Sequence, residues 1–291
     1  MHNEEQQIKE GMPPKRASVV ERFSKHRPAI VGATVVFAIA LIAILAPWIA
    51  PHDPLEQFLG RRLEPPSREF LMGTDTLARC LLTRVIYGTR VSMTVGPVAA
   101  GITLTLGVIV GSLSGFYGGR IDMVLQRIVD IVMCIPSLFL IIAVVALFGA
   151  SMTMTMVVIG LVHWTSPARL VRGEIMKLKE EEYVLAAQSL GARDGKIIFQ
   201  HILPNIVAPL IVYTTLFVAN AILIEAGLSY LGLGTQPPAP SWGNILTAGG
   251  QQLHRAWWMT VFPGAAIFLT ILSINLMGDG LRDALDPKQH Y

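Results

Sequence analysis

The chain has 291 residues, of which 52% are hydrophobic and only 15% carry a formal charge, and its mean hydropathy is +0.53. A soluble globular domain carries about 25% charged residues, so this composition excludes an ordinary soluble domain. The net charge is +3 and the basic residues are scattered, which does not indicate a nucleic-acid partner. Cys80 and Cys134 form neither a disulfide framework nor a metal-binding spacing, and no metal site is expected.

Long uncharged stretches predict membrane-spanning helices, because about 20 apolar residues cross the hydrocarbon core. The apolar run 29–50 is longer than the core of a secretory signal, so we expect a retained first span there. Five further spans are predicted within 91–117, at 131–148, at 152–168, at 206–224 and at 257–277. The predicted fold class is an all-α integral membrane protein with six transmembrane helices.

The distribution of Lys and Arg predicts the orientation. With the N-terminus inside, the internal segments carry sixteen basic residues and the external ones seven, which favours internal N- and C-termini. The resulting organisation is a cytoplasmic segment 1–28, the first span, an external segment 51–90, a five-helix core 91–278 and a cytoplasmic tail 279–291. The core contains a long cytoplasmic loop at 169–205.

The second span contains three glycines at helical spacing, Gly107, Gly111 and Gly115. Such a row of small residues lets another helix approach closely. Two interpretations stay open: ordinary tight packing within the chain, or packing against a helix of a partner channel subunit.

Ionisable side chains are scarce within the predicted spans. His163 lies in the fourth span, and Asp130 and Glu225 lie at span ends. Carriers driven by protons or sodium place acids near the middle of the membrane, so this scarcity argues against a secondary transporter, which remains an alternative.

The loop 169–205 is expected to form a helix to about residue 190, a left-handed cap at Gly191 and a second short helix that ends before Pro204. Taken by itself, this pattern also fits an amphipathic connector on the membrane surface. The stretch resembles the EAA loop of binding-protein-dependent ABC importer permeases, and the matching positions are Ala186, Ala187, Gly191, Leu203 and Pro204. It departs from the family pattern at Leu185, where the family has Glu, and at His201, where it has Ile.

Three other segments extend this resemblance over nearly the whole chain. Residues 72–75 are similar to the external LGTD segment of dipeptide, oligopeptide and nickel permeases. That branch usually continues with Gly-Arg-Asp, whereas this chain has Ala78, Arg79 and Cys80. Residues 225–243 and 278–287 resemble the last external loop and the C-terminal end of the same branch. The chain is most similar to the C-type second permease, and these segments speak against an exporter or an insertion factor with a similar loop.

The resemblance implies the type I ABC importer permease fold in the inner (plasma) membrane, in contact with lipid. The implied partners are a homologous second permease, two ABC ATPase subunits and an external solute-binding protein. ATP and Mg would be bound by the ATPase subunits, and no cofactor is implied for this chain. Dipeptides or oligopeptides are the first expected substrates, with nickel chelates, glutathione, opines and sugars as alternatives.

The residues that the resemblance assigns to docking on an ATPase subunit are Glu182, Ala186, Ala187, Gly191, His201, Leu203 and Pro204. The chain has no G-x-x-x-x-G-K-[ST] loop for nucleotide phosphates, so we expect a non-enzymatic subunit. For Gln236 and Trp242 in the last external loop, we consider contact with the binding protein or a place in the outer gate. The alternative is a proline-stiffened turn with an interfacial aromatic residue.

Overall fold

The structure, a computed structural model, describes residues 19–285, so parts of the expected internal segments 1–28 and 279–291 lie outside it. Within the described residues the regular elements are helices. Five of these helical stretches are long and apolar enough to cross a membrane, and a sharply bent helix pair can form a sixth passage. The predicted all-α membrane architecture is confirmed, with one passage built differently from the rest.

The first two spans are straight helices of different length. A short helix, α2 (Val19–Lys25), leads into α3 (Arg27–Ile49), which matches the predicted first span closely. Helix α4 (Leu81–Tyr117) has 37 residues and is therefore about 55 Å long, well beyond the ~30 Å hydrocarbon core. The external segment expected over 51–90 is shorter than predicted, because residues 81–90 form the outer turns of α4 although they include arginines.

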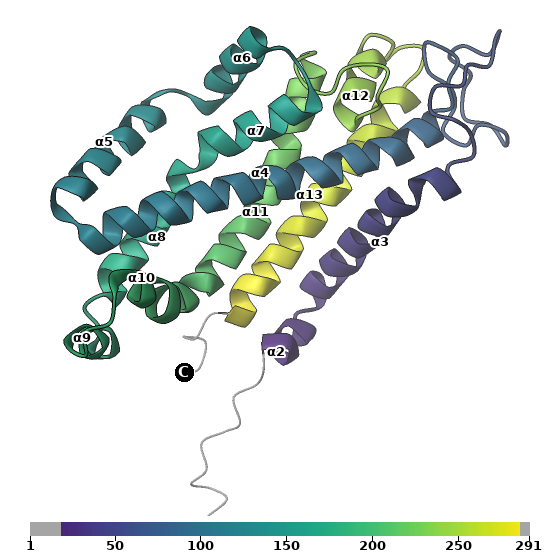
Figure 1. Cartoon of the computed structure of the whole chain (residues 1–291). Coiled ribbons are helices and arrows are strands. Elements are labelled where there is room, and N and C mark those ends of the chain that lie inside the picture. The colour runs from purple at the N-terminus through teal and green to yellow at the C-terminus, as the bar shows by residue number, and fades with distance from the viewer. Residues whose placement is uncertain (1–18, 286–291) are drawn as a thin grey trace, which may run out of the picture.

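The prediction of one straight span at 131–148 is wrong. Helices α5 (Gly119–Cys134) and α6 (Ser137–Phe148) meet at an angle of 84°. Pro136 lies at the bend, and a proline disfavours helical backbone in the residue before it; Ile135 is accordingly extended. Figure 1 shows α5 and α6 as an arm on the side of the bundle opposite α3.

The fourth passage continues into the segment predicted as a loop. Helices α7 (Met152–His163) and α8 (Thr165–Leu178) together form one span-length rod. The first ten residues of the expected loop 169–205 therefore prolong this rod. The helix predicted to continue to about residue 190 is interrupted by a turn at 179–181, after which α9 (Glu182–Ser189) begins.

The fifth passage is longer than predicted and has no break at Pro204. Helix α10 (Asp194–Lys196), the π-helical segment η1 (Ile197–Ile202) and α11 (Leu203–Tyr230) form one stretch of 37 residues. Pro204 lies in the first turn of α11, where the absence of its N–H is tolerated. The prediction that a short helix ends before this proline is therefore wrong: η1, with its wider i→i+5 bonding, carries the helix into α11.

The last two helices complete the outer end and the sixth span. Helix α12 (Trp242–Gly250) begins with a capping box, in which the Ser241 hydroxyl accepts a hydrogen bond from the backbone N–H of Asn244. Helix α13 (Trp258–Leu285) contains the predicted span 257–277 almost entirely and extends beyond its end.

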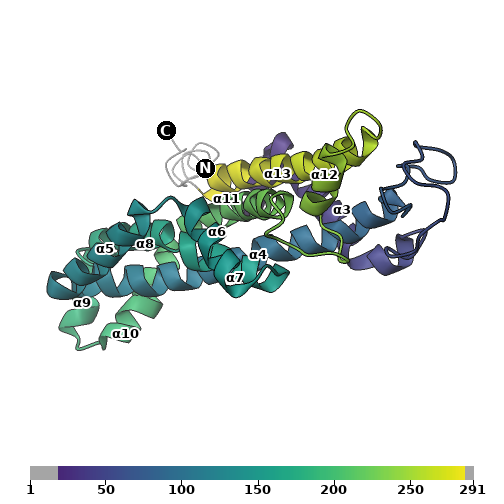
Figure 2. The same ribbon diagram turned by 90° about the horizontal axis from the view of Figure 1, so that it is seen from above.

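Long helices form the middle of the molecule, and the shorter elements that carry the candidate sites lie at the two ends of these helices. Helix α11 packs against both α4 and α13, and α3 packs against α13 and α4. Figures 1 and 2 show α9 and α10 at one end of these rods, and α12 with the 51–80 segment at the other. Buried apolar clusters occur at both ends and in the middle, so each site element rests on a packed core.

Candidate functional site

A short helix, α9, projects beyond the spans at one end of the bundle (Figure 1). It ends at Ser189, Leu190 is its C-cap, and Gly191 follows with φ at +77°. The N–H of Gly191 bonds to the carbonyl of Gln188, and the N–H of Ala192 bonds to the carbonyl of Ala187, which is a Schellman cap. The predicted left-handed cap is confirmed. A Cβ at Gly191 would meet no atom within 4 Å. Within this chain, glycine is therefore needed at this position only for its left-handed backbone angle.

One side chain anchors α9 to the bundle. Val184 is fully buried in an apolar cluster that also contains Ile202 of η1, against which α9 packs, and Ile175 of α8. Residues two positions away along a helix point in nearly the opposite direction, and Glu182 and Ala186 are accordingly exposed. The structure therefore presents these two predicted docking residues on the outer face of α9.

Large apolar side chains surround this outer face. Four of them are exposed by 43%, 47%, 88% and 70%, namely Tyr183, Leu185, Leu190 and Phe199. Exposed apolar surface that is not buried in a membrane span marks an interaction site. The sequence pointed to Leu185 only as a departure from the family pattern, and it did not reveal the other three, because α9 is too short to show a periodic pattern. We call this surface, with Glu182 and Ala186, the α9 patch.

The other predicted docking residues lie at the base of the α9 patch. Ala187 is half-buried on the flank of α9. His201 lies in η1, and Leu203 and Pro204 lie at the start of α11. The loop therefore has two parts. One is the projecting helix α9 with its cap at Gly191, and the other, which we call the base, is the segment around His201 that continues into α11.

A hydrogen-bonded side chain connects these two parts. The Asn205 side-chain nitrogen donates to the His201 carbonyl at 2.6 Å and to the Tyr183 hydroxyl at 3.3 Å. Partial burial, together with the charge of Glu181, raises the pKa of Tyr183 above its ordinary value. The hydroxyl therefore stays neutral and accepts this bond at physiological pH.

The glycine row of α4 is filled by α8 of the same chain. A Cβ would come within 3 Å of α8 atoms at all three positions, at 2.6 Å for Gly107, 2.5 Å for Gly111 and 2.9 Å for Gly115. At Gly111 the obstructing atom is the backbone carbonyl oxygen of Ala168, which cannot rotate away. The row thus brings two helices of one chain into close contact, and its glycines are not presented to a second subunit.

Ion pairs attach α8 to α5 on its other side. Arg172 donates two hydrogen bonds of 2.6 Å to the carboxylate of Asp122, and the Ser114 hydroxyl donates a third. A second pair joins Arg169 to Asp130 at 2.6 Å. Helix α8, which directly precedes α9, is therefore held by close backbone packing and by charge.

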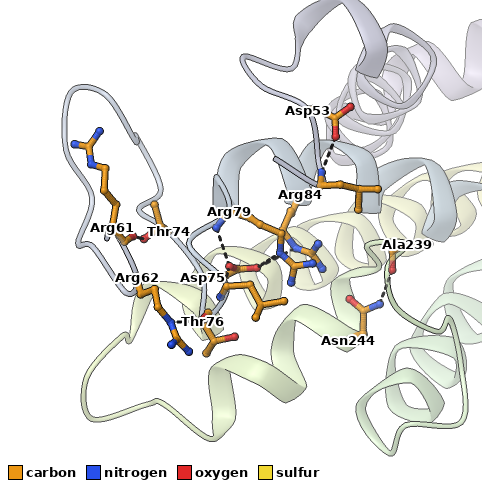
Figure 3. Close-up of polar contacts among 12 residues, drawn as sticks. Asp53, Arg61, Arg62, Thr74, Asp75, Thr76, Arg79, Arg84, Ala239 and Asn244 are labelled. Carbon is orange, nitrogen blue, oxygen red and sulfur yellow. Dashed lines mark hydrogen bonds and ion pairs between the residues drawn. The ribbon is translucent and has the colours of Figure 1, made fainter. Parts of the chain in front are cut away.

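The 51–80 segment and the start of α4 share a buried ionic cluster that sequence reasoning missed. The Asp75 carboxylate lies between Arg79 and Arg84, at 2.7 Å and 3.5 Å (Figure 3). The same carboxylate accepts the backbone N–H groups of Leu77 and Arg79. All three charged side chains are largely buried. The available signal was the arginines that follow Asp75 at helical spacing.

Two tryptophans fix α12 and the 51–80 segment to the spans. The indole N–H of Trp258 donates to the Thr74 carbonyl at 3.2 Å, and that of Trp242 donates to the Val85 carbonyl at 3.1 Å. Trp242 is only 1% exposed, so the hypothesis that it contacts a binding protein directly is wrong in this conformation: the ring packs against α4. Gln236 is exposed and donates to carbonyls of its own turn.

Residues 19–285 contain no group of three or more His, Cys, Asp or Glu side chains placed to hold a metal ion. The groups gathered at the two ends of the bundle are apolar contacts, helix caps and ion pairs. Such groups can hold a docked partner and pass its movement on to the spans. The arrangement is therefore suited to docking and conformational coupling.

Two protein families match the sequence. Residues 107–291 match the family described as binding-protein-dependent transport system inner membrane component. Residues 17–66 match the N-terminal TM domain of oligopeptide transport permease C.

Curated relatives cover nearly the whole chain. It is 42% identical over 274 residues to the di/tripeptide transport system permease protein DppC of Pseudomonas aeruginosa, covering 92% of this chain and 90% of that protein. It is 41% identical over 267 residues to the oligopeptide transport system permease protein OppC of Bacillus subtilis, covering 92% and 88%. Among solved structures, an inward-facing MetNI methionine ABC transporter chain superposes with a TM-score of 0.56 at 17% identity, covering 70% of this chain and 96% of that one. This last likeness concerns the fold.

Proposed function

The chain belongs to the family of binding-protein-dependent transport system inner membrane components, and from this membership we propose that it forms half of the membrane pathway of an importer for dipeptides and oligopeptides. As a member of this family it is a non-catalytic permease subunit of an ABC importer, and it works with ATPase and substrate-binding partners. The peptide substrate is proposed from the names of relatives about 42% identical over most of the chain.

The α9 patch is the observation that carries the coupling role. It is an exposed apolar surface on a projecting helix, at the end of the bundle opposite the external segment. We propose that this patch docks on an ATPase subunit, with Glu182, Ala186 and Leu185 at the contact and Gly191 shaping the end of the helix. His201, Leu203 and Pro204 act from the base, by fixing the position of α9 relative to α11. Under this proposal the patch lies on the cytoplasmic side, in agreement with the predicted internal N- and C-termini.

The packing around α8 supports a mechanical route from the patch into the membrane. Val184 links α9 to α8, the glycine row links α8 to α4, and Arg172 links α8 to α5. Closely packed helices move as rigid bodies rather than bending continuously. A displacement of α9 when two ATPase subunits close would therefore move these spans together and open the pathway to the other side.

The proposed assembly contains one copy of this chain, one homologous second permease, two ATPase subunits and an external binding protein. The second permease supplies the other half of the pathway. The Trp258 indole fixes the 51–80 segment to the start of α13, and Trp242 fixes α12 to α4. In this proposal both elements lie at the end where the binding protein delivers substrate.

Transport by the reconstituted complex tests this proposal. The complex is placed in proteoliposomes with ATP on the ATPase side, and uptake of a radiolabelled dipeptide is measured with and without the binding protein. We expect uptake that requires both ATP and the binding protein, and that Ala187→Asp or Gly191→Asp reduces strongly while the chain remains in the membrane. Uptake driven by an imposed ion gradient without ATP would contradict the importer and support a secondary transporter. Wild-type transport in both variants would contradict the docking assignment.

A further inference from the structure

A hollow lined by polar and aromatic side chains lies halfway along two of the spans. It has a volume of about 360 Å³ and is lined by His163, Ser166, Tyr213, Leu216, Phe217 and Asn220. The first two residues lie near the middle of the α7–α8 rod, and the other four lie near the middle of α11. The hollow therefore lies near the middle of both helical stretches.

The polar groups of this hollow are not arranged to face lipid. Asn220 and Ser166 are exposed in the single chain, and a polar side chain at the centre of a span faces a bundle interior or a water-filled cavity. Pro167 has no N–H to offer the His163 carbonyl, four residues earlier, as an α-helix would. The hollow thus combines exposed polar side chains with a backbone carbonyl that lacks its usual α-helical donor.

The chemistry of the hollow matches a peptide. The His163 Nδ1 lies 3.0 Å from the Ile159 carbonyl, and a ring that donates there keeps its Nε2 as an acceptor. The Asn220 amide has both donors and acceptors, as does a peptide bond. Tyr213 and Phe217 stack with an interplanar angle of 7° and a centroid distance of 6.0 Å, which offers an apolar wall to a side chain. No formally charged residue lines the hollow, so peptides of different charge are accommodated.

The same face of α11 continues to the outer end of the molecule. The hollow uses residues 213, 216, 217 and 220, and a second hollow of about 610 Å³ uses residues 223, 226, 227 and 230. These positions follow one another at intervals of three and four, so they form one stripe along the helix. The stripe connects the outer end with the polar hollow.

We propose that His163, Ser166, Tyr213 and Asn220 form a peptide-contact site halfway along the translocation pathway, where the main chain of the transported peptide is held by hydrogen bonds. This inference rests on the proposed function, since it takes the substrate to be a peptide. The site is open in the single chain, and the second permease closes it from the opposite side.

Cysteine accessibility in the full importer tests the position of the site. Cys134 is exposed, so the background carries Cys134→Ser, and Asn220→Cys is added. A membrane-impermeant maleimide is expected to label Asn220→Cys, and a saturating dipeptide with binding protein and ATP is expected to slow the labelling at least threefold. Thr34→Cys on the exposed face of α3 is the control and should stay unlabelled. An unlabelled Asn220→Cys, or labelling that the dipeptide does not slow, would overturn the proposal.

Transport by Asn220→Leu and Ser166→Ala tests the role of the site. We expect uptake at saturating dipeptide to fall at least fivefold, while co-purification of the partner subunits and ATPase stimulation stay within twofold of the unaltered complex. Thr105→Val, a polar deletion on the exposed face of α4, should leave both unchanged. If the unaltered complex imports dipeptides and both pocket variants do so at its rate, this inference fails and the proposed function stands. If the unaltered complex imports no dipeptide, the proposed function fails first.

Discussion

Arg172 of α8 and Asp122 of α5 meet through two hydrogen bonds of 2.6 Å each, and the pair is partly buried. A guanidinium that engages both carboxylate oxygens is stronger and more directional than a single-contact ion pair. Arg172 lies within the segment predicted as the loop 169–205, and the pair joins α5 to α8.

We predict an energetic coupling between these two side chains. Asp122→Asn and Arg172→Gln should each lower the thermal stability of the purified complex, and the double variant should lose less than the sum, with an interaction free energy of about 0.5–3 kcal/mol. The pair Arg169–Asp130, in which both side chains are 47% exposed, is the matched control and should give about 0.2–1 kcal/mol. Additive effects at Asp122 and Arg172 would contradict the linkage of α5 to α8.

A methyl group at Gly111 should separate α4 from α8. In Gly111→Ala the new Cβ would lie 2.5 Å from the Ala168 carbonyl oxygen, and overpacking of this kind costs about 1–3 kcal/mol. Gly101→Ala in the same helix is the control, because a Cβ there meets no atom within 4 Å. Thermal unfolding of the two purified variants measures the difference, and equal midpoints would show that the glycine row does not set the distance between these helices.

The hydrogen bond from Trp258 to Thr74 should hold the external segment in place. Trp258→Phe removes the donor and leaves a buried carbonyl without its partner, which costs about 1–3 kcal/mol. Protease cleavage within residues 51–80 should therefore become faster. Trp257→Phe is the control, since Trp257 is 51% exposed. Cleavage at the unaltered rate in Trp258→Phe would mean that the segment is held by its ionic cluster and aromatic packing alone.

The backbone angle at Gly191 should decide which substitutions the coupling loop accepts. Asn tolerates left-handed backbone far better than a β-branched residue does, and the space around Gly191 is open. We therefore predict that Gly191→Asn keeps most of the transport rate and that Gly191→Val loses it. ATP-dependent dipeptide uptake by the reconstituted complex measures both, and equal loss in the two variants would point to a steric requirement of the docked partner instead.

The membrane spans could be predicted because a helix needs an uncharged, apolar run of about 20 residues to cross the bilayer. Such runs can be recognised in a single sequence. The outer turns of α4 were missed because Arg84 and Arg90 interrupt that signal, although the cluster around Asp75 buries one of them. The bend at Pro136 did leave a local signal, since the residue before a proline avoids helical backbone. In that segment the uncharged run predicts one span, whereas the proline predicts the bend that the structure has.

The limits of prediction at the sites come from tertiary contacts. The glycine row (Gly107, Gly111 and Gly115) predicts close packing against another helix. Only the position of α8 in the structure shows which helix that is. Trp242 was expected at a surface because it lies in an external loop, and it is buried because α12 folds back against α4. Ser166 and Asn220 are unremarkable in sequence, and they become a candidate site when two distant spans bring them to one hollow.

Docking of the ATPase subunits on the α9 patch is the central claim, and co-purification tests it most directly. The tagged chain is expressed with its native partners, extracted in mild detergent and compared with Ala186→Arg and Ala186→Ser. Ala186 is exposed, so neither change disturbs the folding of the chain itself. We predict that the second permease is recovered with all three proteins, and that the ATPase subunits are recovered with the unaltered chain and Ala186→Ser but are lost with Ala186→Arg. Full recovery of active ATPase subunits with Ala186→Arg would contradict the docking of α9 and require a different contact between membrane and ATPase.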